Sequence, residues 1–199
     1  MSYDRGVRSL LVVACLAACS KSAEPPPAPP ERTDLIRRAD GPLTVVGKTL
    51  EVGDPMPAVT LADGKLQPVD LGALRGKVVV LSVVPSIDTR VCETQTHKVS
   101  DSLEKLPAGA EVYTISRDLP FAQTRFAEDA VIRTKFASDY KGGAFGKAFG
   151  LDVKETGLLA RSVWVIGKDG KIAYRQIVED QGTEPDYDKL IAAAQAANG

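Results

Sequence analysis

The run from Val78 to Val84 constrains the fold of this chain more than any other segment. It is apolar throughout except for Ser82. A continuous apolar run of this length is typical of a β-strand whose two faces are both covered by other elements. Residues 89–106 follow it with apolar side chains at helical spacing. A strand buried on both faces and followed by an amphipathic helix predicts an α/β fold, with helices on both sides of a sheet.

The remaining patterns extend this prediction to a domain spanning residues 41–199. Residues 43–46 and 49–52 are β-prone and flank Gly47-Lys48, which predicts an N-terminal β-hairpin. Strands and helices then alternate, and a terminal hairpin and helix suggest a mixed sheet. The other predicted strands are 58–62, 65–69, 111–116, 131–137, 162–166 and 171–177, and the other helices are 120–127, 145–149 and 186–197.

The first 18 residues read as an export signal rather than as part of the fold. Arg5 and Arg8 precede an apolar stretch, Leu10 to Ala18, that is shorter than the roughly 20 residues a membrane-spanning helix needs. Leu16-Ala17-Ala18-Cys19 resembles a bacterial lipobox, so we expect Cys19 to be lipidated and to become the first residue. The alternatives are an uncleaved anchor or an ordinary signal peptide. Cleavage before Cys15 would leave a very short apolar region.

A linker is expected between the lipid anchor and the domain, over residues 19–40. Residues 21–33 contain five prolines and almost no large apolar side chain, which favours an extended, semi-rigid spacer. The chain would thus lie in the bacterial cell envelope, facing the periplasm. Ser20 is not the aspartate of an inner-membrane retention signal, so the outer membrane is favoured in a Gram-negative host.

Charge and composition exclude two classes of function. The 199 residues include 25 basic and 26 acidic side chains, a formal net charge of −1. A nucleic-acid-binding protein needs a basic surface to neutralise phosphates, so no nucleic acid is expected. Three cysteines and one histidine argue against a protein-ligated metal cluster, and no cofactor is expected.

Cys92 is the candidate reactive residue, because Cys15 and Cys19 lie in the export signal and the anchor. A lone cysteine is otherwise a small buried apolar side chain. Cys92, however, falls in the first turn of a predicted helix, where the helix dipole favours an anion such as a thiolate. Thr89 lies three residues earlier, where its hydroxyl could reach the sulfur or cap the helix. Pro85 ends the preceding strand and removes a competing N–H.

These residues form the motif Pro-x-x-x-Thr-x-x-Cys, and the surrounding text VPSIDTRVCETQT resembles the thiol peroxidase branch of the peroxiredoxins, the atypical two-cysteine type. The resemblance covers roughly residues 43–195. It implies a thioredoxin-like three-layer sandwich with an N-terminal hairpin, and a homodimer as a possible assembly. The segments that carry it are residues 84–96, 116–126 (SRDLPFAQTRF), 157–167 (GLLARSVWVIG) and 183–190 (TEPDYDKL).

The resemblance also implies an active-site arginine, which maps onto Arg161. Its guanidinium would stabilise the thiolate and the charge developing on peroxide oxygen. One family feature is missing. The resolving cysteine usually follows the PFAQ-x-R-aromatic stretch, and here that position is Ala127. An internal disulfide of the family's kind therefore cannot form.

We therefore expect a peroxidase that reduces hydrogen peroxide or organic hydroperoxides through a Cys92 sulfenic acid. An external thiol, either a thioredoxin-like protein or a small molecule, would resolve it. The alternative is a peroxide sensor or redox relay in which Cys92 is oxidised once. A thioredoxin-type electron carrier or copper-delivery protein would need a second cysteine near Cys92. His97, five residues after Cys92, should point away from the sulfur. Asp88 and Glu93 should face solvent.

Overall fold

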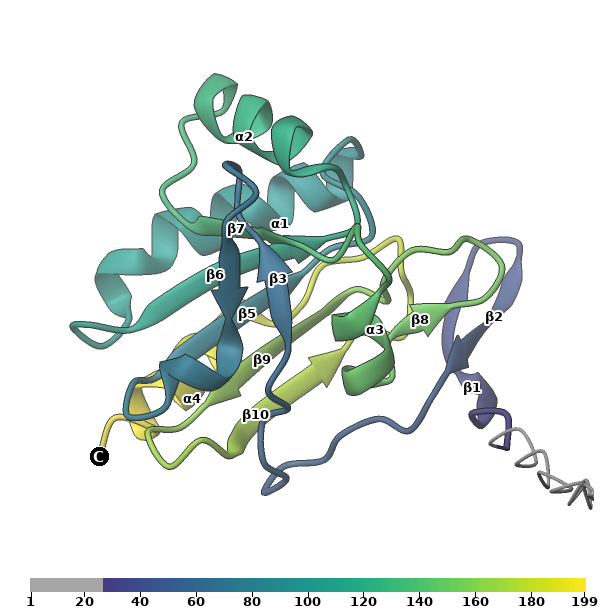
Figure 1. The fold of residues 1–199 in the computed structure, drawn as a ribbon, viewed down its shortest axis with the longest axis horizontal. Helices are drawn as coiled ribbons and strands as arrows, with labels where there is room; N and C mark the ends of the chain where they lie inside the picture. The colour runs from purple at the N-terminus through teal and green to yellow at the C-terminus, as the bar shows by residue number, and fades with distance from the viewer. Residues whose placement is uncertain (1–26) are drawn as a thin grey trace, which may run out of the picture.

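The computed structural model describes residues 27–199, and its centre is a seven-stranded sheet (Figure 1). β5 is the buried apolar run predicted from the sequence; it pairs parallel with β6 and antiparallel with β9, so the sheet is mixed. The strands in spatial order are β10 (Ile172–Ile177), β9 (Ser162–Ile166), β5 (Val79–Val83), β6 (Glu111–Ser116), β7 (Lys135–Ser138), β3 (Thr60–Ala62) and β4 (Pro68–Asp70).

Helices cover both faces of this sheet, as predicted. On one face, α1 (Arg90–Asp101) and α4 (Tyr187–Ala196) pack against alternate residues of the central strands, including Val80 and Val163. On the other face, α3 (Ala144–Phe149) packs Phe149 against Trp164, with ring centroids 5.3 Å apart. α2 (Pro120–Asp129) contacts β7. Two 3₁₀ turns, η1 (Leu71–Leu74) and η2 (Ser102–Lys105), complete the elements.

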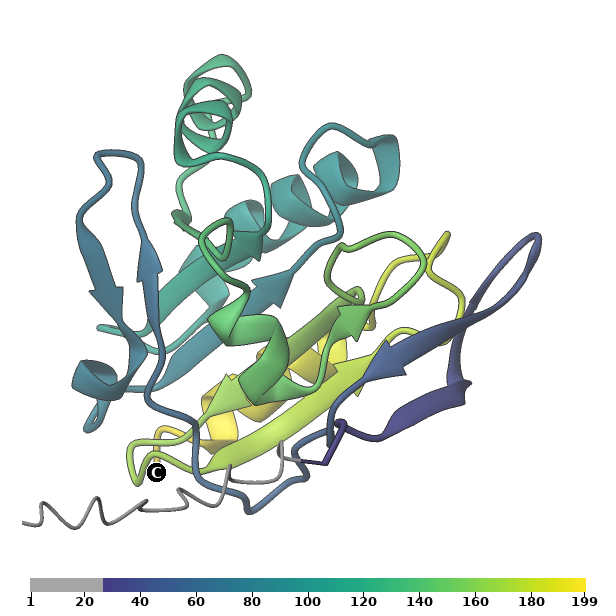
Figure 2. The ribbon, with the colours of Figure 1, turned by 45° about the vertical axis from the view of Figure 1, so that its right-hand side comes forward.

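The N-terminal hairpin is present and includes the strand expected at 43–46, but the partner of that strand is not the one expected. β1 (Glu31–Arg38) pairs antiparallel with β2 (Gly41–Val46), and β2 also pairs with the short β8 (Asp152–Val153). The predicted strand at 49–52 is wrong: these residues form a loop that leads into a turn, where the Glu51 amide donates to the Asp54 carboxylate at 2.8 Å. Figures 1 and 2 show the hairpin beside the carboxyl end of β10.

β1 lies within the residues that the sequence pattern assigns to the linker, so the folded part begins earlier than residue 41. The strand is held because Ile36 is 2% exposed and packs in the main core, although most of its neighbours in β1 are exposed. The predicted signal, Cys19 and the first part of the proline-rich segment fall in residues 1–26, outside the described residues. From residue 27 onward, no helix has the length and apolar character to cross a membrane.

Two further strands begin clearly later than predicted, and the strand expected at 65–69 is β4 at 68–70. The strand expected at 131–137 is β7 at 135–138. Val131 has a positive φ of 52° and is 81% exposed, because it lies in the turn that ends α2 rather than in a strand.

Candidate active site

Cys92 lies just after the loop that joins the central strand β5 to helix α1. β5 ends at Val83, a loop follows, and Cys92 sits in the first turn of α1, fully buried. Asp118, at the end of β6, holds the loop in place. Its carboxylate accepts from the Ser86 hydroxyl and from the Ile87 amide, both at 2.8 Å. The position of the thiol is therefore set by two neighbouring parallel strands.

Thr89 contacts the sulfur directly. Its backbone is extended, with φ −135° and ψ 142°, at the position that precedes α1. Its side chain makes no helix-capping hydrogen bond there; instead Oγ1 lies 2.9 Å from Cys92 Sγ and 3.3 Å from the Ser86 carbonyl oxygen. Of the two roles that the sequence leaves open for Thr89, the structure places its hydroxyl at the thiol.

Arg161 is the second group at the sulfur, as the family resemblance implied. It is 2% exposed and lies immediately before β9, where Nη2 is 3.3 Å from Cys92 Sγ. Nη1 donates to Gln95 Oε1 at 2.8 Å, and Nε donates to the Gln181 carbonyl oxygen at 3.2 Å. None of these hydrogen bonds goes to a carboxylate. The guanidinium therefore places its positive charge at the sulfur, where it can stabilise negative charge that develops during a reaction.

Glu184 is a carboxylate within electrostatic range of Arg161, but its hydrogen bonds go to other residues. Glu184 accepts from Lys98 and from the Tyr187 hydroxyl, at 2.9 Å and 2.7 Å. Burial raises the pKa of Tyr187 well above its usual range, so its hydroxyl stays protonated and remains a donor. The hydrogen bonds of the guanidinium thus go to neutral acceptors and the sulfur, and Glu184 acts on it only through space.

Sequence reasoning missed the two glutamines that hold Arg161. Gln95 follows Cys92 by three residues, on the same side of α1, and its amide nitrogen donates to Ser82 Oγ at 2.9 Å. Gln181 is 7% exposed; its Oε1 accepts from the Arg161 amide at 2.6 Å, and its Nε2 donates to the Val178 carbonyl at 2.5 Å. Helical spacing could have identified Gln95, whereas Gln181 gives no local signal.

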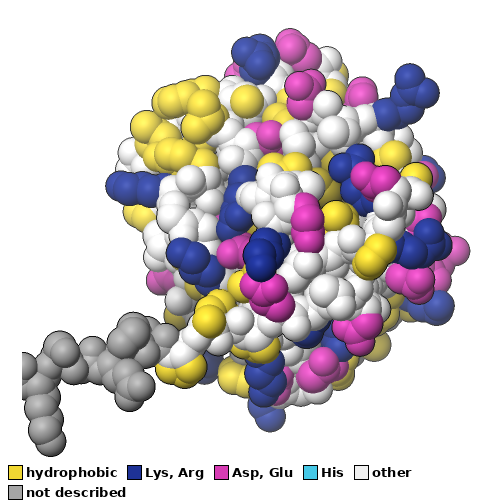
Figure 3. All heavy atoms as spheres, turned by 90° about the vertical axis from the view of Figure 1, so that its right-hand side faces the viewer, with side chains coloured by type: hydrophobic (Ala, Val, Ile, Leu, Met, Phe, Trp, Pro, Cys, Tyr) yellow, Lys and Arg dark blue, Asp and Glu magenta, His cyan; other side chains and the backbone are white. Residues whose placement is uncertain are grey.

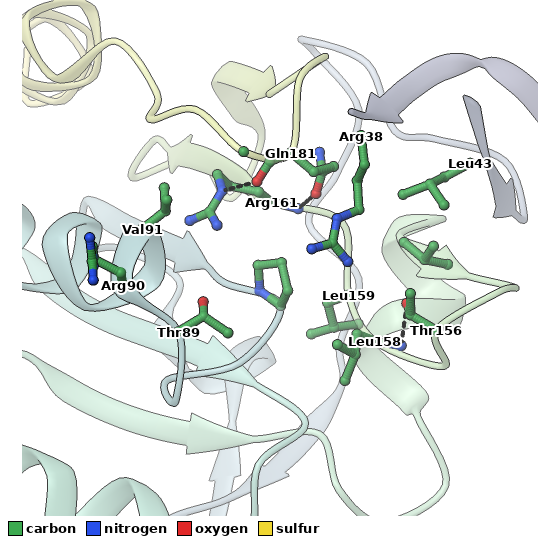
Figure 4. A pocket seen from close by; sticks show the side chains of 13 residues that line it. Arg38, Leu43, Thr89, Arg90, Val91, Thr156, Leu158, Leu159, Arg161 and Gln181 are labelled. Atoms are coloured by element: carbon green, nitrogen blue, oxygen red, sulfur yellow. Dashed lines mark hydrogen bonds between the residues drawn. The ribbon is translucent and has the colours of Figure 1, made fainter. Parts of the chain in front are cut away.

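A pocket of about 200 Å³ lies beside the two side chains that contact the thiol, although the buried Cys92 does not itself line it (Figure 4). Thr89 and Arg161, the two side chains at Sγ, both line it, and Pro85 forms part of its wall. A peroxide in this pocket would therefore meet the hydroxyl and the guanidinium beside the sulfur. The other lining residues are Arg38, Leu43, Arg90, Val91, Val153, Thr156, Leu158, Leu159, Gln181 and Gly182.

The other residues considered in the sequence lie away from this arrangement. Asp88 and Glu93 are exposed, as expected, and the hydrogen bonds at Cys92 Sγ come from Thr89 and Arg161 rather than from His97. Ala127 is on α2 and lines a different cavity. Within residues 27–199, Cys92 is the only cysteine, and no cluster of three metal-binding side chains occurs.

Comparison with known proteins connects this site to a family. Residues 51–191 match the family described as Redoxin. The chain is 43% identical over 157 residues to a thiol peroxidase of Bacillus subtilis (strain 168), covering 78% of this chain and 93% of that protein. It is 44% identical over 157 residues to a thiol peroxidase of Halalkalibacterium halodurans, covering 78% and 94%.

A solved structure agrees with these matches. The crystal structure of a peroxiredoxin-like protein from Aquifex aeolicus superposes with a TM-score of 0.78 at 36% identity, covering 83% of this chain and 98% of that one. The similarity therefore spans the described domain rather than the active-site motif alone.

Proposed function

This chain belongs to the Redoxin family, and from that premise we propose that it is a thiol-dependent peroxidase whose reacting atom is Cys92 Sγ. The observation that carries the proposal is the placement of that atom: buried, 2.9 Å from the Thr89 hydroxyl and 3.3 Å from the Arg161 guanidinium. The thiolate is the nucleophile in thiol chemistry. A fixed cation and a hydroxyl donor beside it suit an attack that moves negative charge onto oxygen.

The first step oxidises the sulfur. The Cys92 thiolate attacks the terminal oxygen of R–O–OH, the S–O bond forms and the O–O bond breaks. The oxygen bearing R leaves with the bonding electron pair and takes up a proton as water or an alcohol, while Cys92 becomes a sulfenic acid. Arg161 and Thr89 stabilise the charge that passes onto the leaving oxygen, and Pro85 limits the access of water to the sulfur.

The second step returns the sulfur to the thiol and needs two external thiols. The first condenses with the sulfenic acid, releasing water and forming a mixed disulfide with Cys92. The second attacks that mixed disulfide, so the two external thiols leave as a disulfide and Cys92 is reduced. Ala127 occupies the position of the family's resolving cysteine, which supports an external rather than an internal resolving thiol.

Replacing the sulfur tests this proposal. Cys92→Ser should abolish peroxide consumption in the presence of an excess small thiol, measured by loss of peroxide over time. Cys19→Ala removes a cysteine outside the described domain and serves as the matched control, with consumption retained. Turnover that persists in the serine variant would overturn the proposal.

The same assay separates a peroxidase from a peroxide sensor, the second candidate. Its supporting observation is that Cys92 has no second cysteine among residues 27–199. A peroxidase consumes many equivalents of peroxide per Cys92 with a suitable thiol, whereas a sensor consumes about one. Peptide mass spectrometry after peroxide, with and without thiol, identifies the oxidised and the mixed-disulfide species.

We further propose that Cys19 carries a lipid anchor in the bacterial cell envelope, with the domain facing the periplasm and the outer membrane favoured in a Gram-negative host. Leu16-Ala17-Ala18-Cys19 and the proline-rich segment after it support this. Cys19→Ala should release the protein from the membrane fraction; retention there would contradict the anchor. The homodimer implied by the family stays a prediction, which sedimentation velocity tests.

A further inference from the structure

The pocket lined by Thr89 and Arg161 has an unusual charge composition. Three of its lining residues are arginines, Arg38, Arg90 and Arg161, and none is acidic. Most of the others are apolar. The surrounding surface is not generally basic: on the face that bears the β1–β2 hairpin, acidic and basic side chains are interspersed (Figure 3). The absence of acidic side chains is therefore a property of the pocket.

Arg38 reaches the pocket because the contacts of Arg37, the residue before it, fix the end of β1. The Arg37 amide donates to the Glu179 carbonyl at 2.8 Å, and its side chain pairs with Glu179 and Asp180, each at 3.3 Å. Successive side chains of a strand point to opposite faces, so Arg38 faces the other way. Figure 4 shows its guanidinium pointing into the pocket toward Leu158 and Thr156. Arg38 forms no ion pair with any residue from 27 to 199.

Arg90 stands on the opposite wall, at an electrostatically unfavourable position. It is the first residue of α1, where the helix dipole disfavours a cation. Its guanidinium also pairs with no carboxylate in the described part of the chain. Arg161 differs, because its Nη2 is already at the thiol. Two of the three arginines around the pocket are therefore exposed and pair with no carboxylate among residues 27–199, and an anion in the pocket would supply a partner.

We propose that this pocket binds the carboxylate of a small organic anion, with Arg38 and Arg90 as its charged contacts, while the reacting end of that molecule lies at Cys92. The inference rests on the proposed function and adds a recognition subsite to it. A volume of about 200 Å³ is below the range of about 300 Å³ and more that drug-sized ligands occupy, so the ligand is small or protrudes into solvent. Leu43, Val153 and Leu158 would contact its hydrocarbon part.

Two reactants of the proposed cycle could carry this carboxylate. One is the hydroperoxide, whose O–O bond is broken by Cys92; the other is the resolving thiol, whose sulfur displaces the oxygen of the sulfenic acid as water. Both would place a reacting atom at the inner end of the pocket and a carboxylate at the outer end. The chemistry recognised is the same, and the two are separable by experiment.

The test compares acidic and neutral compounds of matched size on the full chain. In the oxidation arm, 4-carboxycumene hydroperoxide is compared with cumene hydroperoxide; in the reduction arm, 3-mercaptopropionate is compared with 2-mercaptoethanol at equal thiolate concentration. The variants are Arg38→Gln, Arg90→Gln and the double variant. Arg125→Gln, an exposed arginine on α2, is the control for loss of one positive charge. Modification of the Cys92 peptide is followed by mass spectrometry.

The acidic compound should react faster than its neutral match in at least one arm, and that arm identifies the source of the carboxylate. Each arginine substitution should reduce the acidic-to-neutral rate ratio by about two- to fivefold, the size of an exposed charge pair, and Arg125→Gln should not. A ratio unchanged by Arg38→Gln, Arg90→Gln and the double variant in both arms overturns the subsite.

A binding measurement keeps this outcome separate from a failure of the proposed function. Benzoate should slow the alkylation of Cys92 by iodoacetamide more than benzamide does, and the difference should shrink in the double variant. If peroxide turnover is absent but benzoate still protects, the proposed activity is wrong and the anion site stands. If turnover proceeds and benzoate acts no differently from benzamide, the anion site is wrong.

Discussion

Arg161 and Arg117 are both largely buried arginines next to strands of the main sheet, and they are balanced in opposite ways. Arg117 follows β6; its side chain is 19% exposed, pairs with Asp152, and lies 3.6 Å from the Asp139 carboxylate. Asp139 in turn accepts from the Phe145 and Gly146 amides at the start of α3. Arg161 has no carboxylate among its hydrogen bonds and contacts the Cys92 sulfur instead.

The difference separates a charge used for structure from one kept for chemistry. Asp139 and Asp152 neutralise the charge of Arg117, and Asp139 also holds the start of α3. The charge of Arg117 therefore stabilises the fold and is not available to a substrate. The Gln95 side chain and the Gln181 backbone carbonyl are neutral acceptors that orient the Arg161 guanidinium without cancelling its charge, while the Gln181 side chain accepts from the Arg161 backbone amide. Its positive charge is therefore available to the thiolate and to the oxygen that leaves it.

Arg161→Met should produce the largest change in activity. Loss of one donor at a developing oxyanion costs about 10²- to 10³-fold in rate, which we expect for oxidation of Cys92 by peroxide. The free energy of unfolding should change little, because removing a buried charge that lacks a paired carboxylate offsets the loss of its hydrogen bonds to Gln95 and Gln181. Stopped-flow oxidation and urea unfolding measure the two effects. A large loss of stability with little loss of rate would mean that Arg161 has a structural role, as Arg117 does.

Arg117→Met should give the reverse pattern. Removing the cation leaves the nearly buried Asp139 carboxylate and Asp152 without their partner, and we expect the free energy of unfolding to fall by about 2 kcal/mol. Oxidation of Cys92 at a temperature where the variant is folded should stay within about threefold of wild type. A selective loss of rate in stable, folded Arg117→Met would break the comparison.

Gln181→Leu tests whether the neutral acceptors position Arg161. The variant removes the oxygen that accepts from the Arg161 amide at 2.6 Å, while the backbone carbonyl that accepts from Nε remains. We expect peroxide oxidation of Cys92 to slow about tenfold, the effect of one hydrogen bond. The pH profile of Cys92 alkylation should shift as well, which a purely structural effect would not cause. Gln195→Leu, on α4, is the matched control; equal effects in both variants would contradict a positioning role.

Much of the fold could be predicted from the sequence, and strand β1 shows why the rest could not. The apolar run of β5 leaves few alternatives, so the mixed sheet with helices on both faces was predicted correctly. β1 is different because five of its eight residues are charged, and only Ile36 is buried. Such a strand has no period-two pattern and follows a proline-rich segment. It is held by pairing with β2, which local sequence does not reveal.

The site shows the same division between local and distant contacts. Pro85, Thr89 and Cys92 lie within eight residues and were found from the motif, whereas Arg161 came from the family resemblance. Gln181 reaches Arg161 because the segment after β10 returns beside the start of β9, where the Val178 amide donates to the Arg161 carbonyl. A contact of this kind depends on strand pairing, and no spacing in the sequence indicates it.

The ion pairs of Glu111 should show the smallest effect, because its lysine partners are about half exposed. They test whether an ion pair within the fold contributes to stability and not to activity. Hydrogen bonds from Lys135 and then Lys77 hold the pKa of its carboxyl below its usual range. A depressed folded-state pKa contributes stability that is present above the ordinary carboxyl pKa, about 4.3, and is lost as pH falls through the folded value. Both lysines are about half exposed, so the contribution should be below about 1 kcal/mol. Urea unfolding of wild type and Glu111→Gln should therefore differ slightly at pH 7 and converge toward pH 3, with no change in peroxide oxidation. A difference that grows on acidification would have the wrong sign for a paired carboxylate.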